Sequence, residues 1–158
     1  MASASYQTRR DEIETYFDRT AADAWAALTS DAPVSRIRRT VRRGRDAMRQ
    51  TLMSWLPEDL TGSTLIDAGC GTGTLAIEAA QRGAEVVAID LSPTLVNLAR
   101  ERLRDLNQTL DVTFLVGDMR DMDLGSFDYA VAMDSLIHYD VADGVQTLDA
   151  MAAQIHRK

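Results

Sequence analysis

The first third of the chain repeats its apolar residues at helical spacing. One stripe, at intervals of four, three and four residues, consists of Tyr6, Arg10, Ile13 and Phe17. A second, short helix is predicted to begin at Thr20, with Asp23 in the position of a capping box. From 34 to 56 the apolar positions follow helical spacing again, with arginines on the opposite face, until Pro57 ends the run. Residues 1–57 are therefore predicted to form a helical segment.

After Pro57 short apolar runs alternate with helical patterns, which is typical of a parallel sheet with helices on both faces. The predicted strands span 64–67, 85–90, 112–116 and 127–133. One helix is expected over 73–82, and a second starts at Ser92-Pro93. That second helix is expected to bury Leu95, Val96, Ala99, Leu103 and Leu106. A last helix is expected to bury Val145, Leu148, Met151 and Ile155. The pattern predicts an α/β core over 58–158.

Charge is unevenly distributed along this chain of 158 residues. The formal net charge of -7 argues against a general nucleic-acid binder, which needs a basic surface to replace phosphate counterions. The first third is nevertheless basic, with arginines at Arg36, Arg38, Arg39, Arg42, Arg43, Arg45 and Arg49. We interpret this run as a solvated helix face. Binding of a carboxylate or a partner protein, or contact with a membrane surface, stays open.

The single cysteine, Cys70, offers neither a disulfide framework nor a cysteine metal site, and no metal site is predicted. No stretch approaches the roughly 20 apolar residues that span a bilayer, and the N-terminus resembles no signal or transit peptide. A cytoplasmic location is expected.

A glycine-rich loop, Asp67-Ala68-Gly69-Cys70-Gly71-Thr72-Gly73, follows the first predicted strand. Glycines at this point bring bare backbone close to a ligand at the carboxyl end of a central strand. The loop alone fits two cofactor classes. Residues 71–76 also satisfy the dinucleotide pattern G-x-G-x-x-G/A, and Asp90 can hold a ribose in either case.

Acidic residues at three successive strand ends favour S-adenosylmethionine (AdoMet) over a dinucleotide. Asp67 would attract the ammonium and sulfonium of AdoMet but repel a pyrophosphate. Asp90 can accept hydrogen bonds from both ribose hydroxyls. Asp118 is placed to accept from an adenine amino group, with Met119 as a soft contact for the ring.

Residues 64–139 resemble the class I AdoMet-dependent methyltransferases, in the segments Leu65 to Gly73, Val87 to Ser92 and Gly117-Asp118-Met119. The resemblance implies a Rossmann-like sheet. In that family the glycine loop contacts the amino-acid end of the cofactor, the second-strand acid holds the ribose and the third-strand acid faces the adenine. It therefore implies that the cofactor contacts are Asp67, Gly69, Gly71, Gly73, Asp90, Leu91, Asp118, Met119 and Met133.

Two further segments, Tyr16 to Trp25 and Met133-Asp134-Ser135-Leu136-Ile137-His138-Tyr139, are similar to the magnesium-protoporphyrin IX O-methyltransferase family. The resemblance implies that residues 1–57 cover the cofactor site. It also implies that AdoMet methylates a propionate of Mg-protoporphyrin IX during chlorophyll or bacteriochlorophyll synthesis, leaving S-adenosylhomocysteine. His138 and Tyr16 are the candidate catalytic residues, each able to hydrogen-bond the carboxylate. Trp25 and Trp55 are interpreted as packing residues.

Two alternatives stay open: a methyltransferase for another small acceptor, and a non-catalytic nucleotide-binding or partner-binding module. If the porphyrin is the acceptor, magnesium arrives bound inside the substrate. Magnesium chelatase is then a candidate partner, and a photosynthetic membrane is a candidate peripheral contact.

Class I methyltransferases resemble one another in a seven-stranded sheet, whereas only four strand candidates occur here. A fifth strand is expected to begin where the chain reads Ile155-His156-Arg157-Lys158. We therefore expect an N-terminal portion of a longer enzyme, whose fourth strand has one open flank and is prone to self-association.

Overall fold

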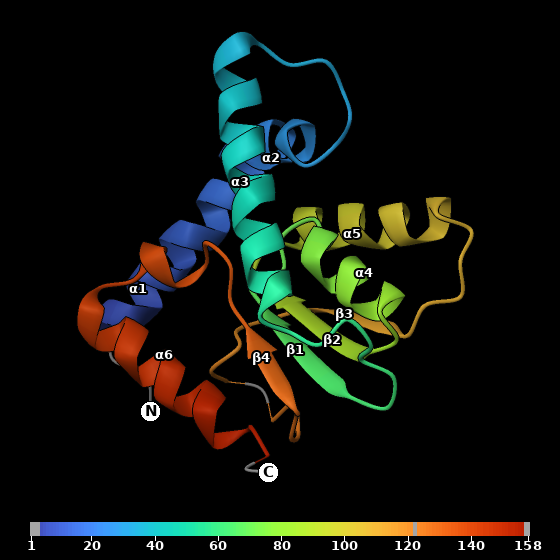
Figure 1. Ribbon diagram of the computed structural model, residues 1–158. Helices are drawn as coiled ribbons and strands as arrows, with labels where there is room; N and C mark the ends of the chain where they lie inside the picture. The colour runs from blue at the N-terminus through green and yellow to red at the C-terminus, as the bar shows by residue number, and fades with distance from the viewer. Residues whose placement is uncertain (1–3, 122, 157–158) are drawn as a thin grey trace.

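A parallel four-stranded sheet forms the centre of the computed structural model, which describes residues 4–121 and 123–156 (Figure 1). Its strands are β1 (Thr64–Ala68), β2 (Glu85–Asp90), β3 (Val112–Val116) and β4 (Tyr129–Val131), in the order β3-β2-β1-β4. The chain changes direction across the sheet between β1 and β4. In open α/β sheets this switch point is where ligands bind, outside the carboxyl ends of the strands.

Helices cover both faces of the sheet, as predicted. On one face α4 (Thr74–Gln81) and α5 (Pro93–Asp105) pack over a large core built from β1, β2 and β3 (Figure 1). On the other face α6 (Val141–Ala153) inserts Met151 into a smaller cluster with Ala68 and Ile89. The sheet is therefore a rigid platform with its carboxyl edge open to the N-terminal segment.

The N-terminal segment is helical, as predicted, and consists of α1 (Ala4–Thr15), a π-helical turn η1 (Tyr16–Thr20), α2 (Ala22–Leu28) and α3 (Arg36–Ser54). The predicted capping box at Thr20 is wrong. The chain passes from α1 into η1 without a break, and Ala21 donates to the carbonyl of Tyr16 at 2.8 Å. As a result α2 begins at Ala22 with no side-chain cap. We call residues 4–54 the cap.

Three predictions of burial or extent differ from the structure. The fourth strand is shorter than 127–133 and ends at Val131. Leu106 is 37% exposed, because it follows the last residue of α5 as its C-cap. In α6 the residues Val145 and Leu148 are about half exposed, since the helix buries a different face, made of Asp143, Thr147 and Met151.

The segment after α6 turns back onto the sheet beside β4. Ile155 lies outside the helix and forms a parallel bridge with Phe127. Phe127 donates to the carbonyl of Gln154 and accepts from the amide of His156, both at 2.8 Å. The four predicted strands are confirmed, and a first rung of strand pairing also occupies the flank of β4 that was expected to be open. Residues 157 and 158 lie outside the described residues.

Candidate functional site

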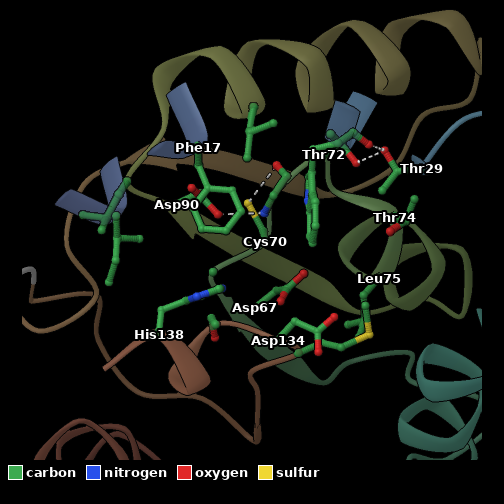
Figure 2. Close-up of a pocket in the computed structure, with 18 of the residues that line it drawn as sticks. Phe17, Thr29, Asp67, Cys70, Thr72, Thr74, Leu75, Asp90, Asp134 and His138 are labelled. Atoms are coloured by element: carbon green, nitrogen blue, oxygen red, sulfur yellow. Dashed lines mark hydrogen bonds between the residues drawn. The ribbon is translucent and has the colours of Figure 1, made fainter. Parts of the chain in front are cut away.

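A cavity lies where the carboxyl ends of β1, β2 and β4 meet the cap (Figure 2). Its enclosed volume is about 70 Å³, and the space amounts to about 770 Å³ when the open mouth is included. The sheet side contributes the glycine loop and the loop after β4, and the cap contributes Ile13, Phe17 and Trp25. The cap therefore forms a roof over the switch point of the sheet.

The glycine loop adopts backbone conformations that require glycine. Gly69 has φ +81°, and a Cβ added there would lie 2.2 Å from the Cβ of Ser135. Gly73 has φ +77°, and a Cβ there would meet the ring of Phe114 at 2.8 Å. Gly69 and Gly71 line the cavity, whereas Gly73 lets α4 start close against the sheet and does not line it. The loop thus presents bare backbone to a ligand.

Asp67 is buried at the end of β1, with 2% of its surface exposed. Asp67 lines the cavity, and its buried Oδ2 atom has no hydrogen-bond partner among the described residues. Burial, and secondarily the negative charge of Asp90, raises the pKa of Asp67 to about 7. A buried carboxylate oxygen without a partner is costly unless a ligand supplies a donor or a positive charge. The cavity therefore fits the ammonium group that AdoMet would place there.

Asp90 ends β2 beside Asp67 (Figure 2). One carboxylate oxygen accepts from the amide of Gly71 at 2.8 Å and the other from the amide of Ser92 at 2.9 Å. Burial raises the pKa of this carboxyl, although the two backbone donors oppose the shift. These bonds fix the carboxylate against the glycine loop, with Leu91 next to it in the cavity wall.

Asp118 is held by the cap and does not line the cavity. Its Oδ1 atom accepts from the hydroxyl of Tyr6 and the amide of Arg120, both at 2.9 Å. Nη1 of Arg10 lies 3.8 Å from Oδ2, which is buried and accepts no hydrogen bond from any described residue. Of the residues predicted to contact adenine, only Met119 reaches the cavity wall. The structure therefore brings Asp118 beside the site and occupies one of its oxygens with α1.

His138 lines the cavity from the short helix η2 (Leu136–His138), close to Met133 on the loop after β4. Its ring makes an edge contact with Phe17, with centroids 5.0 Å apart. Burial, and then the positive charge of Arg9, lowers the pKa of His138, so the ring is neutral near pH 7. A neutral imidazole has one N–H to donate and carries no net charge.

Tyr16 is not brought to the cavity. Its side chain is 53% exposed and borders a separate surface hollow with Thr8 and Glu12. The neighbouring Phe17 points into the cavity instead and packs edge-on against Trp25, with centroids 5.5 Å apart. The catalytic role predicted for Tyr16 therefore has no support in this arrangement, because the stripe that faces the sheet carries Phe17.

The sequence analysis missed an ion pair between Arg45 and Asp134 in the cavity wall. The guanidinium of Arg45 also lies over the ring of Trp25, 4.1 Å from its centroid, so Trp25 packs against a charged side chain. Asp134 adopts a left-handed conformation, φ +59°, which is unusual outside glycine. One signal was present in the sequence: Arg42, Arg45 and Arg49 share a helix face, and these three are the partly buried arginines of the run.

Comparisons with known proteins agree with this geometry. A family model described as "Methyltransferase domain" matches residues 65–157. Magnesium-protoporphyrin O-methyltransferase from Rhodobacter capsulatus is 51% identical over 154 residues, which cover 97% of this chain and 68% of that protein. The chain belongs to the magnesium-protoporphyrin O-methyltransferase family.

One further relative and one crystal structure also match this methyltransferase. The enzyme of the same name from Synechocystis sp. is 30% identical over 92% of this chain, which spans 64% of that protein. The crystal structure of magnesium protoporphyrin IX methyltransferase from Synechocystis PCC 6803 with bound SAM superposes with a TM-score of 0.89. That pair is 28% identical and covers 94% of this chain and 73% of the other. The predicted family and the predicted Rossmann-like fold with N-terminal helices are confirmed.

Proposed function

We propose that this methyltransferase transfers the methyl group of AdoMet to a propionate carboxylate of Mg-protoporphyrin IX, as a step of chlorophyll or bacteriochlorophyll synthesis. The observation that carries the proposal is the buried, unpartnered Asp67 oxygen beside the glycine loop, which suits a cationic cofactor. The acceptor follows from the names of the family members, above all the Rhodobacter capsulatus enzyme.

The cofactor would be held by the glycine loop and the strand ends. Gly69 and Gly71 would admit its amino-acid end, Asp67 would face its ammonium, and Asp90 would accept from its ribose hydroxyls. Each oxygen of Asp90 accepts one backbone amide and keeps a second lone pair for a ribose hydroxyl. We propose that Met119, Leu91 and Met133 supply the apolar contacts.

AdoMet supplies an electrophilic methyl group: the carboxylate oxygen bonds to the methyl carbon as the carbon–sulfur bond breaks, leaving S-adenosylhomocysteine and an ester. A propionate is already ionised at neutral pH, so no residue has to remove a proton. The residues of the cavity have to align the carboxylate and exclude water. His138 is placed to donate its N–H to the carboxylate, and Phe17 and Trp25 shield the cavity from the cap side.

Calorimetric titration with AdoMet, S-adenosylhomocysteine and NAD tests the cofactor, and methyl-ester formation from Mg-protoporphyrin IX tests the acceptor. We expect both AdoMet and its product to bind, NAD not to bind, and the porphyrin to be methylated. AdoMet binding without reaction of the porphyrin would favour another small acceptor. Failure to bind AdoMet would favour a non-catalytic module, and preference for NAD would revive the dinucleotide hypothesis.

We also propose that α3 contacts an anionic membrane surface at its periphery. Four exposed apolar side chains, separated by four, seven and seven residues, share one face of the helix: Ile37, Val41, Met48 and Trp55. Exposed arginines flank this face, among them Arg38 and Arg43. An apolar face bordered by arginines is the pattern of helices that lie in the interface of an anionic bilayer. No helix of the described residues is long and apolar enough to cross a membrane.

Sedimentation with vesicles tests this contact. We expect binding to vesicles rich in phosphatidylglycerol, weak binding to neutral vesicles, and loss of binding in Ile37→Asp, with Thr40→Asp as the control on the helix flank. Equal sedimentation of Ile37→Asp and the parent protein would contradict the membrane contact. If Ile37→Asp still binds vesicles but no longer methylates porphyrin bound to magnesium chelatase, the apolar face of α3 is assigned to that partner instead.

A further inference from the structure

The negative charge of the cavity wall is unfavourable for the proposed acceptor. This wall holds three carboxylates, Asp67, Asp90 and Asp134, around the same space (Figure 2). A propionate that enters this space is itself an anion, and like charges repel strongly where water is excluded. Among the described residues that line the cavity, Arg45 alone has a permanent positive charge, because His138 is neutral near pH 7.

Arg45 is fixed in place with donors to spare. Its side chain is 15% exposed, stacked on Trp25 and paired with Asp134 through Nη1. That bond is the one hydrogen bond that Arg45 makes among the described residues, so Nε and Nη2 stay available. These two atoms form the side of the guanidinium fork that binds a carboxylate with two parallel hydrogen bonds.

Neighbouring arginines of the same helix have other tasks. Arg42 donates to the carbonyls of Ala27, Leu28 and Ala32 and so anchors the end of α2. Arg49 pairs with Asp46 and Glu78. Neither Arg42 nor Arg49 lines the cavity, although both border an adjoining hollow that shares four lining residues with it: Thr29, Arg45, Thr74 and Met133. Arg45 thus lies at the boundary between the cofactor cavity and this hollow.

We propose that Arg45 binds the second propionate of the acceptor, the one that is not methylated, and so selects acceptors that carry two carboxylates. This assignment rests on the proposed function. The reacting carboxylate needs its electron density for attack on the methyl carbon, and a guanidinium bound to it would withdraw that density. The position of Arg45 at the edge of the cavity instead suits a carboxylate held to one side of the reacting group.

Variants of Arg45 and Asp134 distinguish two roles of Arg45: binding a carboxylate of the acceptor, or only neutralising Asp134. If Arg45 served only to neutralise Asp134, removing either charge would disturb the enzyme alike. If Arg45 binds a carboxylate, Asp134→Asn removes a competing anion and lowers KM, whereas Arg45→Met raises it. Asparagine also tolerates the left-handed backbone at position 134, so this variant keeps the loop geometry.

Steady-state kinetics with two acceptors tests the proposal: Mg-protoporphyrin IX and a magnesium porphyrin with a single propionate. We expect the parent protein to prefer the first acceptor by KM. Arg45→Met should raise KM for Mg-protoporphyrin IX by about tenfold, since a charge-assisted hydrogen bond is lost. Its KM for the single-propionate acceptor and its kcat should stay within about twofold, as expected for uniform binding.

Control variants complete the experiment. Arg39→Met removes an exposed arginine on the side of the same helix opposite its apolar face and should leave both KM values unchanged. Arg45→Lys keeps the charge without the fork and should give an intermediate KM, which also guards against loss of folding in Arg45→Met. Equal KM values for the two acceptors in the parent protein, or the same rise in KM for Arg45→Met and Asp134→Asn, would overturn the role of Arg45. The proposed methyl transfer would not be affected by either result. Absence of methylation of both porphyrins by the parent protein would overturn the proposed function with it.

Discussion

Burial sets the charge of the side chains around the cavity. It raises the pKa of Asp67 to about 7 and lowers the pKa of His138. In the folded protein Asp67 therefore holds its proton from its ordinary pKa of 3.8 up to about 7, a range where the unfolded chain has lost it. The folded state binds more protons in this window, so the free energy of unfolding of the unliganded protein falls as pH rises through it. A cationic ligand reverses this cost, because it favours the ionised carboxylate.

The affinity for AdoMet should therefore rise with pH. Binding of a cation ionises Asp67 and releases a proton below about pH 7, so Kd should fall between pH 6 and 8 and level off above. Asp67→Asn should weaken binding by about tenfold or more and remove most of this slope. Calorimetry in two buffers of different ionisation enthalpy measures the released proton directly. The same slope in the asparagine variant would assign the pH effect to another group, with Asp90 the first candidate.

His138 should affect the acceptor and leave the cofactor unaffected. Replacing it with alanine removes one hydrogen bond to the carboxylate and should lower kcat/KM for the porphyrin by about tenfold, with the Kd for AdoMet unchanged. The other histidine, His156, is exposed and lies outside the cavity, so His156→Ala is the matched control. A parallel loss of activity in both variants would show that the effect does not come from the cavity.

At the scale of elements, the loops after β1 and β4 support each other. Ser135 donates to the carbonyl of Ala68 at 2.8 Å, and Gly69 lies directly against Ser135. The left-handed turn at Asp134 makes this approach possible and at the same time directs the carboxylate towards Arg45. The cavity wall therefore depends on two non-adjacent loops that fit together because Gly69 has no side chain.

Two glycine substitutions should have opposite effects on stability. Gly69→Ala puts a Cβ 2.2 Å from Ser135 at φ +81° and should lower the free energy of unfolding by about 2 kcal/mol or more. Gly44→Ala lies inside α3 with nothing within 4 Å and should raise it by about 0.5–1 kcal/mol. Urea unfolding of both variants measures the difference. An unchanged midpoint for Gly69→Ala would mean that the loop after β4 moves away freely.

Elements with a strong local signal were predicted well. The strands β1, β2 and β3 follow apolar runs with turns at both ends, and the helix start at Ser92-Pro93 is confirmed, with Ser92 accepting from the amide of Leu95. The errors arose where the local sequence pattern does not indicate which residues are buried or where a helix begins. Periodicity identified α6 as a helix but not which face is buried, and the continuous turn through η1 removed the cap expected at Thr20.

The residues of the site were likewise predicted only where a local sequence signal marks them. Asp67, Asp90 and the glycine loop were found because each follows a strand at the switch point of the sheet. The pairs Arg45–Asp134 and Tyr6–Asp118 join residues 89 and 112 positions apart, and no local signal links them. The hydroxyl of Tyr16 makes this residue a candidate on chemical grounds, whereas the direction of the helix decides that its neighbour Phe17 faces the cavity.

At the scale of the molecule, polar contacts attach the cap to the sheet. Asp18 accepts from the hydroxyl of Ser92 and the amide of Thr94, at the start of α5. Arg102 of α5 donates to both Thr29 and Thr72, which joins the end of α2 to the glycine loop. The first helix adds a single buried side chain, Tyr6, which stacks on Tyr139 and donates to Asp118.

Loss of the Tyr6 hydroxyl should loosen α1. Tyr6→Phe leaves a buried carboxylate short of a donor and should lower the stability of the cap by about 1 kcal/mol or more. Trypsin should then cleave faster after Arg9 and Arg10 in α1, and AdoMet should slow this cleavage. Tyr16→Phe, which removes an exposed hydroxyl on the adjoining turn, is the control. Equal cleavage rates for the two variants would mean that the hydroxyl of Tyr6 contributes nothing to the attachment.

The single buried anchor of α1 also bears on how fast the enzyme can turn over. Ile13, Phe17 and Trp25 of the cap line the cavity, so movement of the cap would widen the exit for a spent cofactor. Where a lid must open for product release, that motion commonly limits kcat. A first helix with one buried side chain is expected to detach more easily than one with a fully apolar interface, which would be more stable and slower to release product. The modest packing of α1 is therefore a compromise between shielding the methyl transfer from water and starting the next cycle.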